Sequence, residues 1–276
     1  MITELRQRDP VLFWIGALMV LSLVVVTLLS IGDARLILGI NPWIKPMKFL
    51  SSIVIFLWTV GWFMPETQSN AVGSGFSRID KRQIVRWTIG SAMLIEIACI
   101  IMQSARGTTS HYNINSAIDS AIFAVMGVTI FVNTVAMAMF LWILRRDTPP
   151  NRAGYLWGIR LGVAIFLLAS LEGVLLVANG AHTVGAPDGG PGLPFVNWST
   201  RAGDLRVAHF FGMHAMQALP LLGFVLDRSF ASRGSSPGVL SSALARNLVI
   251  AVSMLWAAIM GGLLLIALQG RPLLAL

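Results

Sequence analysis

The stretch VLFWIGALMVLSLVVVTLLSI, residues 11–31, contains no charged side chain. The hydrocarbon core of a bilayer, about 30 Å thick, is crossed by roughly 20 apolar residues in helical form, so this stretch has the length of one transmembrane helix. Arg6 and Arg8 precede it, as basic residues precede a signal peptide, but the apolar run is longer than a usual signal sequence and no small-residue cleavage pattern follows. We interpret it as a retained transmembrane helix.

Six more apolar runs of similar length follow along the chain. The composition agrees with a membrane protein, since 56% of the 276 residues are hydrophobic, 12% are charged and the mean hydropathy is +0.76. A water-soluble domain carries about twice that share of charged residues. The sequence therefore predicts an all-α polytopic membrane bundle of about seven helices, forming a single transmembrane domain over residues 1–276. The six further spans are expected at about Pro46–Met64, Val85–Met102, Ala117–Leu144, Leu156–Ala178, Val207–Leu226 and Leu248–Leu268.

Composition also excludes several classes of site. Cys99 is the only cysteine, which excludes a disulfide framework and a zinc or iron–sulfur centre built from thiolates. Any metal would have to be bound by histidines and carboxylates. The net charge of +8 would favour nucleic-acid binding in a soluble protein, but in a polytopic one basic residues are expected in cytoplasmic loops. We therefore predict the lipid bilayer as a partner and no nucleic acid.

The basic residues divide unequally between the two sets of connecting segments. Thirteen of the twenty fall on one side and seven on the other. Positively charged loops tend to stay in the cytoplasm, which predicts an N-terminus inside and a C-terminus outside. The thirteen are Arg6, Arg8, Arg78, Lys81, Arg82, Arg86, Arg145, Arg146, Arg152, Arg160, Arg228, Arg233 and Arg246.

All four histidines fall in or beside the predicted outer connections. This coincidence predicts a polar, histidine-containing site that opens to the outer face, with His111, His209 and His214 as candidates for binding a metal or haem. His209 and His214 are five residues apart, or about 140° around a regular helix, so they cannot both bind one ion as an i, i+4 pair can. Either one of them meets His111 or a carboxylate, or each belongs to a separate centre.

Further polar residues gather at the same predicted face. Lys45 and Lys48 are three residues apart beside Pro46, where a helix can begin, so they could contact an anionic small molecule or a lipid head group. The alternative is that both lysines reach toward the interface, with Trp43 as an aromatic anchor. The other residues predicted to line the site are Arg106, Asp119, Asp204 and Arg206.

Two carboxylates lie within predicted spans, Glu96 in the third and Glu172 in the fifth. An ionisable group at this depth is costly unless it is paired, protonated or in contact with water, so each is a candidate functional residue. Glu96, Cys99, Gln103 and Arg106 follow one another at three, four and three residues, which places them on one stripe of a helix. We expect this stripe to face the bundle interior. The alternative role is a neutral glutamic acid that is hydrogen-bonded to a neighbouring helix.

The predicted outer loop at about 180–203 is rich in glycine and proline, which excludes a helix there. Phe195 and Trp198 near its end favour a lid over an outer site, and a plain connector is the alternative.

The segments NPWIKPMKF (41–49), SARGTTSHYN (104–113) and WSTRAGDLRVAHFFGMH (198–214) together resemble an uncharacterised family of bacterial multi-pass inner-membrane proteins. The resemblance implies a bacterial inner membrane and supplies no activity. The set His111, His209, His214, Asp119 and Ser116 is also similar to that of seven-helix membrane hydrolases of the alkaline ceramidase type, in which three histidines hold zinc. That family pairs two histidines as HxxxH on its last helix, whereas this chain has HxxxxH on its sixth span and no histidine on its seventh.

Three classes of function remain open from the sequence. The first is a histidine-containing outer site that binds haem or a metal for redox or lipid chemistry. The second is a proton-coupled transporter or permease in which Glu96 and Glu172 carry protons. The third is a membrane assembly subunit with no site of its own. Whether the protein is an enzyme stays open among these three.

Overall fold

The computed structural model describes residues 2–67, 71–72, 79–145, 147–231 and 239–275. Within these residues, seven helical spans are long and apolar enough to cross a membrane, which confirms the predicted all-α polytopic bundle. The chain forms two compact units, each described by itself: unit 1 comprises Met1–Ile143 with Pro194–Val196, and unit 2 comprises Leu144–Leu193 with Asn197–Leu276. The single domain and the orientation stay predictions, and Arg78, Arg146 and Arg233 lie outside the described residues.

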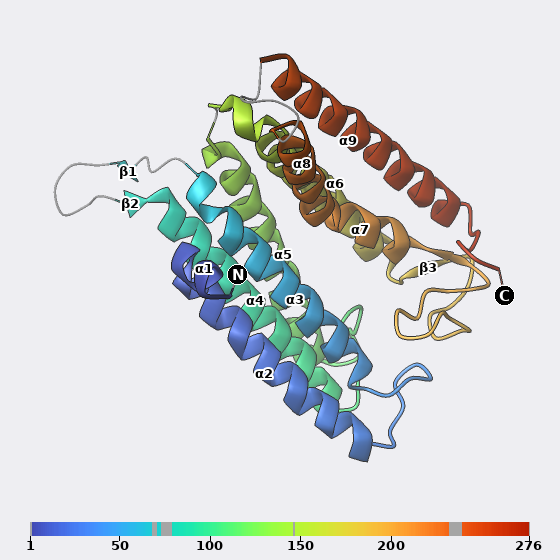
Figure 1. The fold of residues 1–276 in the computed structure, drawn as a ribbon. Coiled ribbons are helices and arrows are strands. Elements are labelled where there is room, and N and C mark those ends of the chain that lie inside the picture. Colours follow the sequence, from blue (N-terminus) through green and yellow to red (C-terminus); the bar gives the residue numbers. More distant parts are fainter. Residues whose placement is uncertain (1, 68–70, 73–78, 146, 232–238, 276) are drawn as a thin grey trace. The chain divides into compact units, whose positions relative to one another are not determined.

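Unit 1 is built around four long helices (Figure 1). Helix α2 packs against α3, α4 packs against α5, and α3 also contacts α4. A short antiparallel ladder joins β1 to β2 between α3 and α4. The elements are α1 Ile2–Arg8, α2 Pro10–Gly32, α3 Ile44–Phe63, the 3₁₀ turn η1 Met64–Glu66, β1 Ala71–Val72, β2 Ile79–Asp80, α4 Lys81–Ala105 and α5 Ala117–Ile143.

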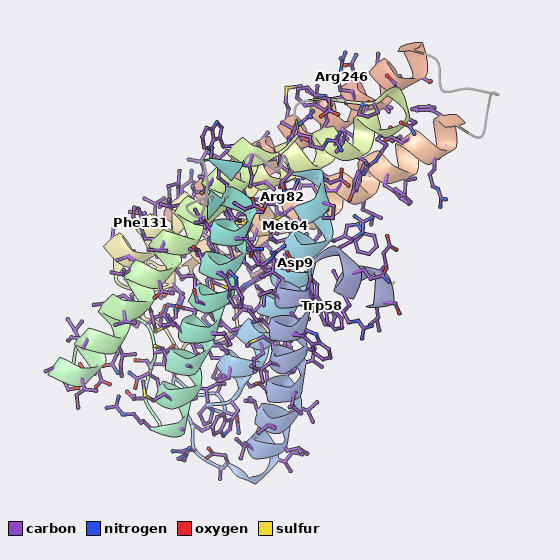
Figure 2. All side chains as sticks on the ribbon, turned by 90° about the vertical axis from the view of Figure 1, so that its left-hand side faces the viewer. Asp9, Trp58, Met64, Arg82, Phe131 and Arg246 are labelled. Carbon is purple, nitrogen blue, oxygen red and sulfur yellow. The ribbon has the colours of Figure 1, made fainter. Side chains whose placement is uncertain are left out.

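Local chemistry decides where α2 begins. Asp9 caps the helix by accepting a hydrogen bond from the Leu12 amide, and Pro10 occupies the first turn, where its missing N–H costs nothing. The other oxygen of the buried Asp9 accepts from Arg86 Nε at 2.7 Å, which ties the start of α2 to α4. Side chains of unit 1 face either its interior or its surroundings. Figure 2 shows an example of each, with Asp9 inside the bundle and Phe131 on the outer side of α5.

Unit 2 contains the remaining three spans, of which the sixth consists of two helices. Helix α6 contacts α7, α8 and α9, and a second short antiparallel ladder joins β3 to β4. The elements are the 3₁₀ turn η3 Pro150–Arg152, α6 Ala153–Asn179, β3 Thr183–Val184, β4 Gly203–Asp204, α7 Leu205–Met213, α8 Ala215–Ala231 and α9 Val239–Leu268.

A stripe of glycines at every fourth residue of α6 allows α8 to approach closely. A Cβ atom on Gly158 would lie 2.5 Å from the Leu219 carbonyl oxygen, and one on Gly162 would lie 2.8 Å from that of Ala215. Gly154 continues the stripe and meets Gly223, whose own Cβ would overlap the Gly154 backbone. In lipid, such close backbone contact gains van der Waals energy that larger residues would prevent.

The predicted sixth span was expected to be one regular helix, but the structure interrupts it at His214, between α7 and α8. Pro220 lies inside α8 and cannot donate a backbone hydrogen bond to the Met216 carbonyl, which weakens the first turn of α8, directly after the interruption. Because Gly162 has no side chain, the Ala215 backbone can lie close to α6. His209 lies within α7, and the His214 amide still donates to the Phe210 carbonyl, so the helical spacing between the two histidines is kept up to the break.

Candidate functional site

The loop between α4 and α5, residues 106–116, folds back against its own helix. Gly107 has a φ of +73°, a left-handed conformation that favours glycine, and ends α4 by donating to the Ser104 carbonyl. The buried Asn113 amide donates to the Thr108 hydroxyl and to the Thr109 carbonyl, which closes the loop. His111 lies between Thr109 and Asn113 in the chain, so the compact loop holds it beside the helices of unit 1.

His111 lies between a buried carboxylate and a lysine. Its Nε2 is 3.9 Å from Glu96 Oε1, and its Nδ1 is 3.2 Å from Lys45 Nζ and 3.1 Å from the Ser110 hydroxyl. Lys45 was predicted to contact an anion, His111 to bind a metal or haem, and Glu96 to be a functional carboxylate within a span. The structure brings these three residues together, and we call them the Lys45–His111–Glu96 cluster. An ammonium group only donates hydrogen bonds, so the contact with Lys45 makes Nδ1 the acceptor and assigns the proton of a neutral ring to Nε2, facing Glu96.

Glu96 has the most demanding environment of the cluster. Its side chain is buried, with 2% of the residue exposed, and within the described part of the chain Oε2 has no hydrogen-bond partner. Cys99 and Gln103, on the same stripe of α4, are buried as well, whereas Arg106 is exposed at the helix end. A buried carboxylate oxygen without a partner is costly, so Glu96 remains a candidate functional residue.

Aromatic rings enclose the imidazole of His111. The ring centroids of Phe49, Tyr112 and Phe123 lie 5.8, 6.1 and 6.3 Å from that of His111. Tyr112 has a φ of +57°, which a bulky residue adopts only under strain of about 1–3 kcal/mol. This strained residue directly follows the histidine in the 106–116 loop.

Arg106 and Asp119, both predicted to line a site, form an ion pair instead of two open groups. Arg106 Nη1 is 2.7 Å from Asp119 Oδ1, which also accepts from Gln103 Nε2 at 2.9 Å. The second oxygen of Asp119 accepts from the Ser116 hydroxyl at 2.6 Å. The pair closes the 106–116 loop onto α5 and thereby supports the position of His111.

Lys48 contacts the segment Pro194–Val196, which belongs to unit 1. Its Nζ donates to the Val196 carbonyl at 3.2 Å. Part of the predicted lid loop is thus held beside the N-terminal turns of α3. Its opening and closing stay a prediction.

In unit 2, Asp204 and Arg206 stabilise the chain that leads into α7. Asp204 is buried, caps α7 through the Arg206 amide and accepts from the Ser199 amide at 2.8 Å. Arg206 Nη2 lies 2.6 Å from Asp204 Oδ2 and donates to the Asn197 carbonyl. Both residues therefore connect the predicted outer loop to the start of a span.

Glu172 is the second buried carboxylate. It is 4% exposed, and neither of its oxygens accepts a hydrogen bond from any residue that the structure describes. His209 lies in the neighbouring helix, where its Nδ1 donates to the Ala169 carbonyl at 2.8 Å, and the ring of His214 packs against Phe210 at 4.3 Å. The bond to Ala169 puts the proton on Nδ1, which leaves Nε2 as the acceptor of the neutral ring.

The predicted centre shared by His111 with His209 or His214 stays a prediction, because His111 belongs to unit 1 and the other two belong to unit 2. Over the described ranges, no group of three or more His, Cys, Asp and Glu side chains is arranged to hold a metal ion.

A second histidine–carboxylate contact escaped the sequence reasoning. Asp188 Oδ2 lies 2.6 Å from His182 Nδ1, and Asp188 also accepts from the backbone amides of His182 and Thr183 and from the Thr183 hydroxyl. Burial alone would raise the pKa of Asp188, but the hydrogen bonds from His182 and Thr183 outweigh burial and hold it well below its usual value. The sequence offered one signal for this contact, which is that Asp188 stands between Pro187 and Gly189 in a loop.

We expect the 182–188 turn to loosen in acid and on removal of the Asp188 charge. A folded-state pKa below the unfolded one means that the stabilisation is complete above about pH 4 and declines as the pH falls further. Asp188→Asn should accelerate amide hydrogen exchange at His182 and Thr183 at neutral pH, whereas Asp147→Asn, at an exposed aspartate, should not. Unchanged exchange in Asp188→Asn would contradict this role.

No protein-family model, curated protein or solved structure matches this chain. The bacterial inner membrane therefore stays a prediction.

Proposed function

We propose that this integral membrane protein is a proton-coupled transporter in which Glu96 binds and releases the proton and His111 connects Glu96 to the end of the bundle where Lys45 lies. One observation carries the proposal: a histidine held between a buried carboxylate in a membrane span and a lysine at a helix end. Intramembrane carboxylate and histidine chains are the usual elements of proton pathways through membrane proteins.

The environment of Glu96 suits alternating protonation. As a neutral acid it leaves no charge in the buried interior, and as a carboxylate it can pair with a protonated His111 at 3.9 Å. The two forms are thus accommodated in one place, which a group that exchanges a proton requires. Oε1, the oxygen nearer to His111, can carry the acid proton.

His111 can relay the proton through its two ring nitrogens. A proton arriving from water binds Nδ1, the Nε2 proton passes to Glu96 Oε1, and rotation of the ring restores the starting tautomer. The 3.9 Å gap is longer than a hydrogen bond, so the transfer needs a small approach of the two groups or one bridging water.

Lys45 supplies a means of coupling to an anionic solute. While its ammonium contacts Nδ1, that nitrogen is occupied and a positive charge opposes a second proton on the ring. An anion that draws Lys45 away would release Nδ1 for protonation. Lys48, one turn further along α3, adds a second positive charge, so the solute class that this site favours is a small anion.

The experiment measures proton uptake by liposomes that contain the full chain and a pH-sensitive dye, with inorganic phosphate or acetate as the external anion. We expect protein-dependent uptake that falls by about tenfold or more in His111→Ala, because one proton-transfer group is lost. Added imidazole should restore it by replacing the missing ring. His182→Ala is the matched control, since His182 lies in the other unit.

Uptake that is the same in His111→Ala and wild type would contradict the proposed relay, and so would the absence of protein-dependent uptake with either anion. Failure of imidazole to restore uptake would indicate that His111 acts by packing rather than by proton transfer.

A histidine-containing haem or metal site for redox or lipid chemistry is the second candidate function. It is supported by His209, whose Nδ1 donates to a backbone carbonyl and leaves Nε2 for a ligand, the arrangement common among metal-binding histidines. Analysis of the detergent-purified protein for haem absorption and bound metal tests it. A stoichiometric metal that is lost in His209→Ala would favour this candidate over the transporter.

A further inference from the structure

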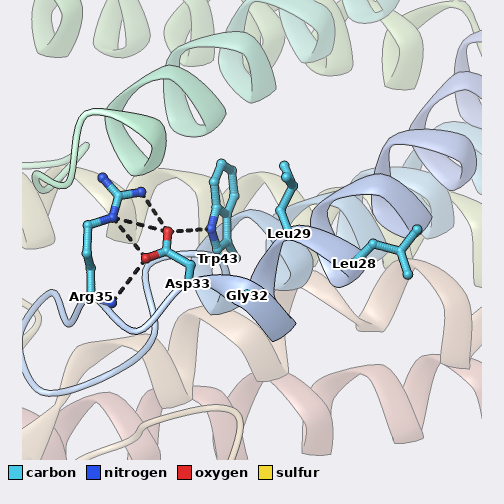
Figure 3. A pocket seen from close by; sticks show the side chains of 6 residues that line it. All are labelled: Leu28, Leu29, Gly32, Asp33, Arg35 and Trp43. Carbon is cyan, nitrogen blue, oxygen red and sulfur yellow. Dashed lines mark hydrogen bonds and ion pairs between the residues drawn. The ribbon is translucent and has the colours of Figure 1, made fainter.

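Unit 1 has a shallow pocket where α2 ends. Its volume is about 480 Å³, and it is lined by Leu28, Leu29, Gly32, Asp33, Arg35 and Trp43. The residues are arranged by polarity, because Figure 3 shows Arg35 and Asp33 on one side of the Trp43 ring and Leu28 and Leu29 on the other. The pocket lies at the end of an apolar span, the depth at which lipid head groups meet acyl chains.

The polar side of the pocket presents both signs of charge. Arg35 Nη2 lies 2.6 Å from Asp33 Oδ2, and Trp43 Nε1 donates to the same oxygen at 2.8 Å. Arg35 Nη1 donates to the Ala105 carbonyl, and with the side chain 49% exposed its terminal nitrogens keep N–H groups for a further acceptor. The hydrogen bonds from Arg35 lower the pKa of Asp33, and the pair therefore stays ionised at neutral pH.

The end of α2 contributes negative character beside the arginine. The last carbonyl groups of a helix have no partner within it and form the negative end of its dipole. The Ser30 carbonyl accepts from the Asn41 amide, whereas Gly32, the final residue of α2, lines the pocket together with Asp33 and Arg35. A ligand that carries a phosphate and an ammonium group a few bonds apart matches this pattern of charge.

The apolar side matches an acyl chain. Leu28 and Leu29 are 64% and 46% exposed, so they offer unburied hydrocarbon surface directly beside the charged pair. We propose that this pocket binds one phospholipid with an amine head group, phosphatidylethanolamine, with its phosphate on Arg35, its ammonium at the end of α2 and an acyl chain along Leu28 and Leu29.

The choice among phospholipids follows from hydrogen bonding and charge. The trimethylated ammonium of phosphatidylcholine has no N–H to donate to a carbonyl or carboxylate. Phosphatidylglycerol carries no cation to pair with Asp33, so its phosphate leaves it with a net negative charge that Asp33 repels. We therefore expect phosphatidylethanolamine to bind about tenfold more tightly than phosphatidylcholine or phosphatidylglycerol, because only its ammonium donates a charge-assisted hydrogen bond here.

The experiment titrates the delipidated full chain in detergent with each of the three lipids and counts bound lipids by native mass spectrometry. Arg35→Gln should weaken phosphatidylethanolamine binding by about tenfold, through loss of the phosphate contact. Gly32→Trp should block the pocket while keeping both charges of the ion pair, because Gly32 lines the pocket and a Cβ atom there meets nothing within 4 Å beyond its chain neighbours. Gly127→Trp, at another open helical glycine of unit 1, is the matched control and should bind as the wild type does.

Equal binding of the three lipids, or tighter binding of phosphatidylglycerol, would overturn the assignment of an amine head group. Binding of phosphatidylethanolamine that is unchanged in Gly32→Trp would place the lipid elsewhere. Because Gly32→Trp retains both Arg35 and Asp33, its result stands even if Arg35→Gln fails to fold.

Discussion

Replacing Glu96 by glutamine is expected to abolish proton-coupled uptake while leaving the protein folded. The amide has the shape of the neutral acid and fits the same buried position, but it cannot bind and release a proton, so uptake should fall by about 100-fold or more. The measurement is the liposome uptake assay, combined with thermal unfolding in detergent. Infrared spectroscopy should also show a protonated carboxyl band that is lost in Glu96→Gln.

Two further variants separate chemistry from packing at this position. Glu4→Gln removes a carboxylate whose side chain is half exposed, so both uptake and stability should stay at wild-type levels. Glu96→Ala should lose uptake and also reduce stability by about 1–3 kcal/mol, since it leaves His111 without its carboxylate and opens a cavity. A folded Glu96→Gln with wild-type uptake would contradict the proton role, and a Gln variant less stable than the Ala variant would contradict the neutral-acid argument.

Replacing Gly158 by leucine is expected to disrupt unit 2. A Cβ atom there would lie 2.5 Å from the Leu219 carbonyl oxygen and 2.7 Å from the Pro220 Cα, and both neighbours are backbone that can move only if α8 separates from α6. Overpacking of this kind costs about 3 kcal/mol or more, which exceeds the gain of roughly 1 kcal/mol from replacing a helical glycine. The expected result is a lower melting temperature, or loss of the monodisperse protein, in detergent.

Gly173→Leu is the matched control, because Gly173 lies in the same helix and a Cβ atom there meets nothing within 4 Å. It should be as stable as the wild type or slightly more stable. If Gly158→Leu melts at the temperature of Gly173→Leu, the close approach of α6 and α8 does not contribute to stability.

The seven spans could be read from the sequence because hydrocarbon accepts only long apolar helices with their backbone groups internally bonded. The packing of α6 on α8 was readable too, since Gly154, Gly158 and Gly162 recur at every fourth residue, but the sequence reasoning did not use this spacing. The break at His214 was not readable from hydropathy, because an apolar run keeps its length whether or not one turn is irregular.

The sequence also determined which residues were chemically unusual in unit 1: a carboxylate within a span, a histidine in the following loop and a lysine beside Pro46. Hydropathy and spacing suffice for this, because the cost of a charge in hydrocarbon depends on its position along the span. That these three residues meet was decided by tertiary structure alone. The left-handed turn at Gly107, the strained Tyr112 and the Arg106–Asp119 pair return the 106–116 loop to α4, and contacts between residues so far apart in the chain leave no periodic pattern in it.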